Sequence, residues 1–111
     1  MPIITIKSSG RKNQIDLAKA AQLTSEKSGI AVERFFVIAE YHEGTFFNSA
    51  DEAPLIIHIA ASERNSKETI QKLMFAAAES VAEILSMDDR KIPVYVHPIQ
   101  EGYLALNKEF I

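Results

Sequence analysis

Pro2 is the residue of this chain whose type and position suggest chemistry most directly. An internal proline has neither a backbone N–H nor a basic nitrogen, so it takes no part in proton transfer. Loss of Met1 would give Pro2 a free secondary amine. A free α-amino group titrates near ~7.7–8.0, so modest burial or a neighbouring cation makes it a base at neutral pH. Pro2 is therefore a candidate general base. The alternative is that it has no chemical role and is an ordinary proline at the first position of a strand.

Composition bounds the class of protein. The chain has 111 residues, of which 47% are hydrophobic and 24% charged, as expected of one soluble domain spanning residues 1–111. The formal net charge is −3 and the basic residues are scattered, which argues against nucleic acid as a partner. There is no cysteine, so disulfides and thiolate catalysis are excluded.

Other kinds of site and partner are not predicted either. His42 and His58 show no metal-ligand spacing with acidic residues or with each other, so we predict no metal and no cofactor. No apolar run approaches the ~20 residues that cross a bilayer, which predicts no membrane partner. The start of the chain lacks the basic segment and apolar core of a signal peptide, so we expect a cytoplasmic protein.

The first half of the chain predicts a strand, a helix and a second strand. β-branched residues favour a strand of about five residues from Ile3, ended by Ser8-Ser9-Gly10. Asn13 followed by Asp16 is a weak helix-start signature, and Gly29 is the expected helix stop. The nearly continuous apolar segment 32–39 predicts the second strand. The helix between them carries an apolar stripe at Leu17, Ala20, Ala21 and Thr24.

The second half repeats this pattern after a loop at 43–53. A strand is predicted at 54–59, a helix from the Asn65 and Glu68 pair, and a returning strand at 92–96. The apolar stripe of this helix is Ile70, Leu73, Met74, Ala77, Val81, Ile84 and Leu85.

The two halves correspond closely enough to be pseudo-repeats, at about 2–48 and 54–107. Pro2 corresponds to Pro54 and Arg11 to Arg64. The repeat predicts an α+β fold in which tandem β-α-β units form a four-stranded mixed sheet with two helices on one face. The other face, expected to be rich in Ile, Val and Phe, would be uncovered, which predicts an oligomer.

These features resemble the tautomerase superfamily, the group of oxalocrotonate tautomerase and macrophage migration inhibitory factor, in its longer fused form. The resemblance covers nearly the whole chain. It is carried by Met1-Pro2-Ile3-Ile4, by Gly10-Arg11, by the segment 33–37 and by the repeated unit from Pro54. Phe46-Phe47 and the end of the chain from Tyr103 to Phe110 are more similar to a poorly characterised bacterial branch.

The resemblance implies that Met1 is removed and that Pro2 shuttles a proton on a small 2-keto or enol carboxylic acid. It also implies that Arg11 and Arg64 bind the substrate carboxylate, since a guanidinium group matches a carboxylate bidentately. Longer members assemble as trimers, so a homotrimer is expected. Tyr41, Phe46, His97 and Tyr103 are candidates to line an apolar pocket around Pro2, with subunit contacts as the alternative for the aromatic residues.

Two alternatives stay open at this stage. In the first, Pro2 is a cationic acid in a hydratase, dehalogenase or decarboxylase, with Glu33, Glu40 or Tyr103 activating water. In the second, the chain is a non-catalytic trimeric binding protein that keeps Met1, has an occluded pocket and has no arginine near Pro2. Arg34 is assigned a structural role, paired with Glu33 or another neighbour.

Overall fold

The computed structural model describes residues 1–9, 15–43 and 55–110. Arg11, Phe46 and Pro54 lie outside the described residues, as does most of the predicted loop at 43–53.

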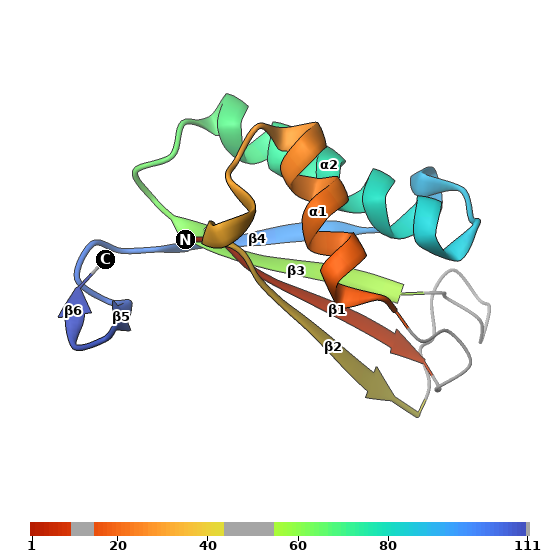
Figure 1. Cartoon of the computed structure of the whole chain (residues 1–111), viewed down its shortest axis with the longest axis horizontal. Coiled ribbons are helices and arrows are strands. Elements are labelled where there is room, and N and C mark those ends of the chain that lie inside the picture. Colours follow the sequence, from red (N-terminus) through yellow and green to blue (C-terminus); the bar gives the residue numbers. More distant parts are fainter. Residues whose placement is uncertain (10–14, 44–54, 111) are drawn as a thin grey trace.

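Two strand–helix–strand units form the body of the protein (Figure 1). The first unit consists of β1 (Ile3–Ser9), α1 (Leu17–Ser28), the 3₁₀ turn η1 (Val32–Arg34) and β2 (Phe36–His42). The second consists of β3 (Leu55–Ser62), α2 (Lys67–Leu85), the 3₁₀ turn η2 (Asp89–Lys91) and β4 (Val94–Ile99). Each unit pairs its own two strands in parallel, as a helical crossover requires.

The four strands form one mixed sheet in the order β2-β1-β3-β4, with β1 and β3 antiparallel at its centre. Both helices lie on the same side of this sheet (Figure 1). The predicted α+β fold is therefore confirmed. Within the described residues, no helix is long and apolar enough to span a membrane.

The core lies between the sheet and the helices. Alternate residues of each strand face the helices, so Ile6, Ile57 and Ile59 are completely buried. Leu73 and Val81 of α2 close the core from the other side. The predicted stripe of α2 is buried or packed against this core, whereas Leu17, placed on the stripe of α1, is exposed.

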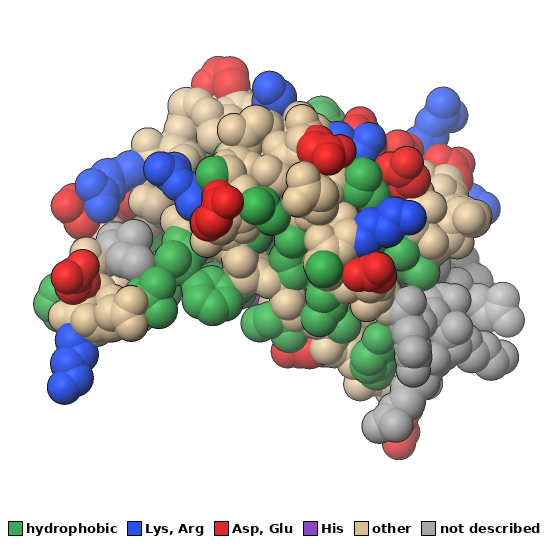
Figure 2. Space-filling view, in the orientation of Figure 1, with side chains coloured by type: hydrophobic (Ala, Val, Ile, Leu, Met, Phe, Trp, Pro, Cys, Tyr) green, Lys and Arg blue, Asp and Glu red, His purple; other side chains and the backbone are tan. Residues whose placement is uncertain are grey.

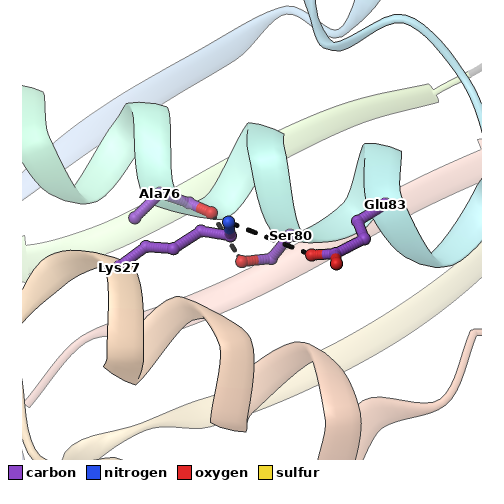
Figure 3. A network of polar contacts seen from close by, with 4 residues as sticks. All are labelled: Lys27, Ala76, Ser80 and Glu83. Carbon is purple, nitrogen blue, oxygen red and sulfur yellow. Dashed lines mark hydrogen bonds and ion pairs between the residues drawn. The ribbon is translucent and has the colours of Figure 1, made fainter.

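The two helices pack against each other, and Figure 3 shows polar contacts where they meet. Lys27 of α1 lies 3.9 Å from Glu83 of α2, but both side chains are substantially exposed, so this ion pair contributes only about 0–1 kcal/mol. The buried Ser80 hydroxyl donates to the carbonyl of Ala76 in its own helix at 2.6 Å, so it adds no unsatisfied group to the helix interface.

Several predicted boundaries were wrong by a few residues. The segment 32–34 is the turn η1, and β2 begins at Phe36, whose N–H donates to the carbonyl of Pro2 at 3.0 Å. A nearly continuous apolar run has no alternation to mark its start, so the pairing with β1 decides it. The last strand likewise begins at Val94, after η2, and runs on to Ile99.

The helix ends show which residues cap them. Asp16 and Ser66 are the N-caps, and their side chains accept hydrogen bonds from the backbone N–H groups three residues on, each at 3.1 Å. The predicted signatures had placed Asp16 inside the first turn and had begun the second helix from Asn65. Gly29 ends α1 with a φ of 79°, which confirms the predicted stop.

The face of the sheet away from the helices, called the open face below, is more polar than predicted. Its apolar members include Phe36, Ile38 and Tyr95, which are 44%, 41% and 48% exposed. The strand valines turn to the helix side instead and pack against the core. The alternation and the strand register place the following side chains on the open face: Ile3, Thr5, Lys7, Phe36, Ile38, Glu40, Ile56, His58, Tyr95 and His97.

A short C-terminal hairpin stands away from the body (Figure 1). It consists of β5 (Ala105–Leu106) and β6 (Glu109–Phe110), joined by two residues with φ of 54° and 61°. Positive φ at both central positions is the geometry of a type I′ turn, which matches the twist of a hairpin. Figure 2 shows hydrophobic side chains on this hairpin and along the side of the body opposite the helices.

Leu73→Ala tests the core assignment. The Leu73 side chain is 1% exposed, so its truncation leaves a cavity and should lower the free energy of unfolding by about 2–5 kcal/mol. Phe75→Ala is the matched control on the same helix, because Phe75 is 70% exposed and should change stability by less than about 0.5 kcal/mol. Denaturant unfolding measures both variants, and equal losses would contradict this core.

Candidate functional site

Pro2 is buried and lines a small pocket at one end of the sheet. The cavity measures about 50 Å³. Its walls come from the N-terminus, from the segment around η1 and from the first turns of α2: Met1, Pro2, Ile30, Arg34, Asn65, Thr69, Ile70 and Leu73.

Strand pairing brings these segments together. β1 and β3 are antiparallel, with Ile3 opposite Ala60, so the start of the chain lies beside the end of β3 and the turn that leads into α2. β1 and β2 are parallel, with Ile3 opposite Phe36, so the start of the chain also lies beside η1. The hydrogen bond from the Phe36 N–H to the Pro2 carbonyl fixes this second contact.

Arg34 gives the pocket a positive charge. Burial lowers the pKa of the Met1 amine below its ordinary value, and the Arg34 guanidinium lowers the pKa further. Both causes disfavour the protonated amine beside the Arg34 guanidinium. An amine in this pocket is therefore neutral, and able to accept a proton, at a lower pH than an exposed amine. While Met1 is attached, the nitrogen of Pro2 is an amide and carries no basic lone pair.

Arg34 was not placed beside Pro2 by the sequence pattern. It was assigned a structural role, whereas the structure places this residue in the pocket wall with Pro2, where its charge lowers the pKa of the N-terminal amine. The signal was present in the sequence, because parallel pairing of the first two strands puts the start of the second beside the N-terminus. Asn65 and Thr69 were missed for a related reason, since only the antiparallel β1–β3 pairing brings α2 to Pro2.

Arg64 lies at the same end of the sheet but is not part of the wall around Pro2. Its Nη1 is 3.7 Å from Oε1 of Glu101, and both side chains are more than half exposed. The neighbouring Asn65 lines the pocket, so a change of rotamer would be needed to bring the guanidinium to Pro2. Its role as a carboxylate ligand stays a prediction, as does that of Arg11, which lies outside the described residues.

The aromatic and histidine candidates are dispersed. Tyr41 pairs with Ser8 near the far end of β1, about 20 Å from Pro2 at ~3.3 Å per residue. His97 and Tyr103 line a separate open pocket of about 420 Å³ at the end of β4, before the C-terminal hairpin. Within the chain, none of these three lines the Pro2 pocket, and Phe46 lies outside the described residues.

A third pocket, of about 350 Å³, lies between α2 and the start of β4. It is larger than the Pro2 pocket but lies at the start of β4, at the end of the sheet away from the N-terminus. Its walls are Met74, Phe75, Ala78, Glu79, Asp89, Arg90, Ile92 and Val94. Size alone does not identify the site, because only the Pro2 pocket holds a terminal amine beside a cation. In the described ranges, no three His, Asp or Glu side chains are grouped to hold a metal ion.

Solved structures with this architecture are numerous. A fused 4-OT, described as a wild-type asymmetric trimer, matches with a TM-score of 0.78 and 12% identity over 97% of this chain and 94% of that one. A member of the cis-3-chloroacrylic acid dehalogenase family matches with a TM-score of 0.78 and 17% identity, covering 98% and 82% of the two chains. A protein inactivated by 2-oxo-3-pentynoate matches with a TM-score of 0.78 and 12% identity, covering 95% and 91%.

The chain therefore has the fold of the tautomerase superfamily, and the resemblance inferred from the sequence is confirmed at that level. The chain spans nearly the whole length of a fused 4-OT. No protein-family model matches the sequence, and the search of curated proteins found no match.

Arg34→Gln should raise the pKa of the N-terminal amine, because the positive charge that disfavours its protonation is removed. The pH dependence of N-terminal acylation, followed by mass spectrometry, reports this pKa. Arg90→Gln is the matched control, since Arg90 is also exposed and lies at the opposite end of β4. A pKa that moves equally in both variants would contradict a local effect of Arg34.

Proposed function

We propose that the chain is a tautomerase or isomerase that moves a proton on a small 2-keto or enol carboxylic acid. In this proposal Met1 is removed and Pro2 is the acid and base. The observation that carries it is the shared pocket of Pro2 and Arg34, which would place the amine freed by loss of Met1 beside a guanidinium group able to bind a carboxylate.

The proposed reaction needs only proton transfer. The neutral amine of Pro2 takes a proton from the carbon next to the substrate carbonyl, and the electron pair of the broken C–H bond forms an enolate. The Pro2 ammonium then returns the proton to another atom of the same conjugated system, so the amine is regenerated. Arg34 holds the substrate carboxylate in a charge-assisted hydrogen bond and stabilises the charge that develops beside it.

The first turn of α2 supports binding of the same anion. Ser66 caps this helix, and the pocket is lined by Asn65, just before the cap, and by Thr69 of the first turn. A helix N-terminus carries a partial positive charge, so it adds to the attraction of Arg34 for a carboxylate. We propose that Arg11 and Arg64 are further carboxylate ligands, as the resemblance implies.

Removal of Met1 serves two purposes in this proposal. It frees the nitrogen of Pro2, and it takes away one wall of the pocket. A cavity of about 50 Å³ is small beside ligand pockets, which commonly measure about 300–1,000 Å³. A 2-keto acid needs more room, so the chain with Met1 attached should be inactive on both grounds.

The hydratase-type alternatives require a group that activates water near Pro2. Glu40 pairs with Lys7 on the open face. It lies four residues along β2 from Phe36, the residue beside the start of β1, so it is far from Pro2. Glu33 and Tyr103 do not line the Pro2 pocket either. The geometry of the described chain therefore favours proton transfer alone. A non-catalytic binding protein of the same fold is the remaining alternative, and it predicts that Met1 is retained.

We also propose that the chain assembles as a homotrimer through its open face. The exposed Phe36, Ile38 and Tyr95 on that face support an association between copies. The trimeric assembly of structures with this fold supports the number of copies.

The catalytic proposal is tested first by the intact mass of protein expressed without an N-terminal tag, which should lack Met1. Ketonisation of an enolpyruvate-type acid should then fall by on the order of 100-fold in Pro2→Ala, as expected for loss of a general acid–base. A variant with an N-terminal extension that cannot be removed keeps Pro2 in an amide and should be inactive. Retained Met1, or equal rates in all three proteins, would contradict the role of Pro2.

Arg34→Ala should lower kcat/KM for the same acid by about tenfold to a hundredfold, because a hydrogen bond to a charged group contributes about 1.5–3 kcal/mol. The substrate amide or ester, which lacks the carboxylate, should show a much smaller loss. Arg90→Ala is again the control and should retain full kcat/KM. A similar loss on the charged and neutral substrates would show that Arg34 does not bind the carboxylate.

A further inference from the structure

His58 occupies the centre of the open face. It lies on β3, one of the two inner strands, opposite Thr5 of β1 and Tyr95 of β4. Its imidazole stacks on the Tyr95 ring with centroids 4.6 Å apart and planes 10° from parallel. The side chain is half-buried in the single chain, and any copy that covers the face will bury it further.

The charges around His58 oppose its protonation. Lys7 and His97 lie diagonally on either side of His58 on the same face. Lys7 is two residues along β1 from Thr5, which pairs with His58, and His97 is two residues along β4 from Tyr95, its other partner. Glu40 of β2 is the acidic group on this face, and it lies across from Lys7, one strand further away. Burial lowers the pKa of His58, and the charges of Lys7 and His97 lower this pKa further, while Glu40 opposes the shift.

We propose that copies of the chain associate through the open face only while His58 is neutral, so that protonation of this imidazole separates them. The proposal rests on the assembly proposed above and identifies what regulates it. A second copy is the occupant because this face combines exposed apolar side chains with a fold that forms trimers elsewhere. A charged imidazole covered by that copy would be desolvated beside Lys7 and His97 with too little acidic compensation.

The direction of the pH effect follows from linkage. Association buries His58 further, so the pKa of His58 is lower in the assembly than in the separate chain. The separate chain therefore binds more protons, and dissociation is favoured as the pH falls. A lowering of the His58 pKa by about one unit would increase the dissociation constant tenfold per histidine, or up to about a thousandfold for three copies.

The experiment is sedimentation velocity of the full chain at about pH 7.5 and about pH 5.5, a range that spans the titration of histidine. The wild type should be assembled at the higher pH and largely single chains at the lower pH, with an unchanged far-UV circular dichroism spectrum. His58→Gln should stay assembled at both, because glutamine cannot take up a proton. His42→Gln, at the end of β2 on the same face, should respond as the wild type does.

The outcomes separate this proposal from the one on which it rests. Single chains at about pH 7.5 would contradict the assembly itself. A wild-type assembly that persists at about pH 5.5, or His58→Gln that dissociates like the wild type, would overturn only the role of His58. If His42→Gln alone lost the pH response, the switch would be His42 and the proposed role of His58 would be wrong.

A measurement on the wild type keeps the proposal testable should His58→Gln fail to fold. Dilution of the assembly near the midpoint of the transition, in buffers of different ionisation enthalpy, gives the number of protons taken up on dissociation by calorimetry. The proposal requires net uptake of about half a proton per chain for a pKa shift of about one unit, rising toward one for a larger shift. Zero uptake would overturn it.

Discussion

The antiparallel pairing of β1 with β3 is the contact on which the rest of this structure depends. It joins the two strand–helix–strand units into one sheet, and it fixes Ile3 opposite Ala60. A slip of one residue between these strands would put their apolar side chains on opposite faces, so that either Ile6 or the pair Ile57 and Ile59 would turn away from the helices. The core thus enforces the register, and the register decides what surrounds the N-terminus.

The same register acts on both sides of the sheet. On the helix side it brings Pro2 to the first turn of α2, where Asn65 and Thr69 complete the pocket. On the open face it brings Lys7 diagonal to His58, so a central histidine has a cation as its neighbour. The proposed chemistry and the proposed assembly would therefore share strands, although the residues assigned to them point in opposite directions.

The sequence was sufficient for the fold because the repeat is long and its apolar stripes are regular. Helix starts and stops were placed within about three residues, since Asp16, Ser66 and Gly29 act through local hydrogen bonds and backbone conformation. Strand starts were less predictable, because Phe36 begins β2 only through its partner in β1. The site was harder still. Pro2 was a candidate because a terminal proline has special chemistry. The position of Arg34 beside Pro2 follows only from the pairing of β1 with β2. Arg64 is turned toward Glu101, which the sequence did not predict.

The two units resemble each other in one more respect, which bears on how many reactive centres a chain can have. Each unit has a 3₁₀ turn with an arginine just before its second strand, Arg34 in η1 and Arg90 in η2. Each also begins with a proline in the sequence, but Pro54 has a peptide bond on both sides. Duplication can copy an arginine and a strand, but it cannot copy a chain terminus. Under the proposed role of Pro2, a chain built of two such units has a basic proline only in the first, so the second unit need not keep the residues around it.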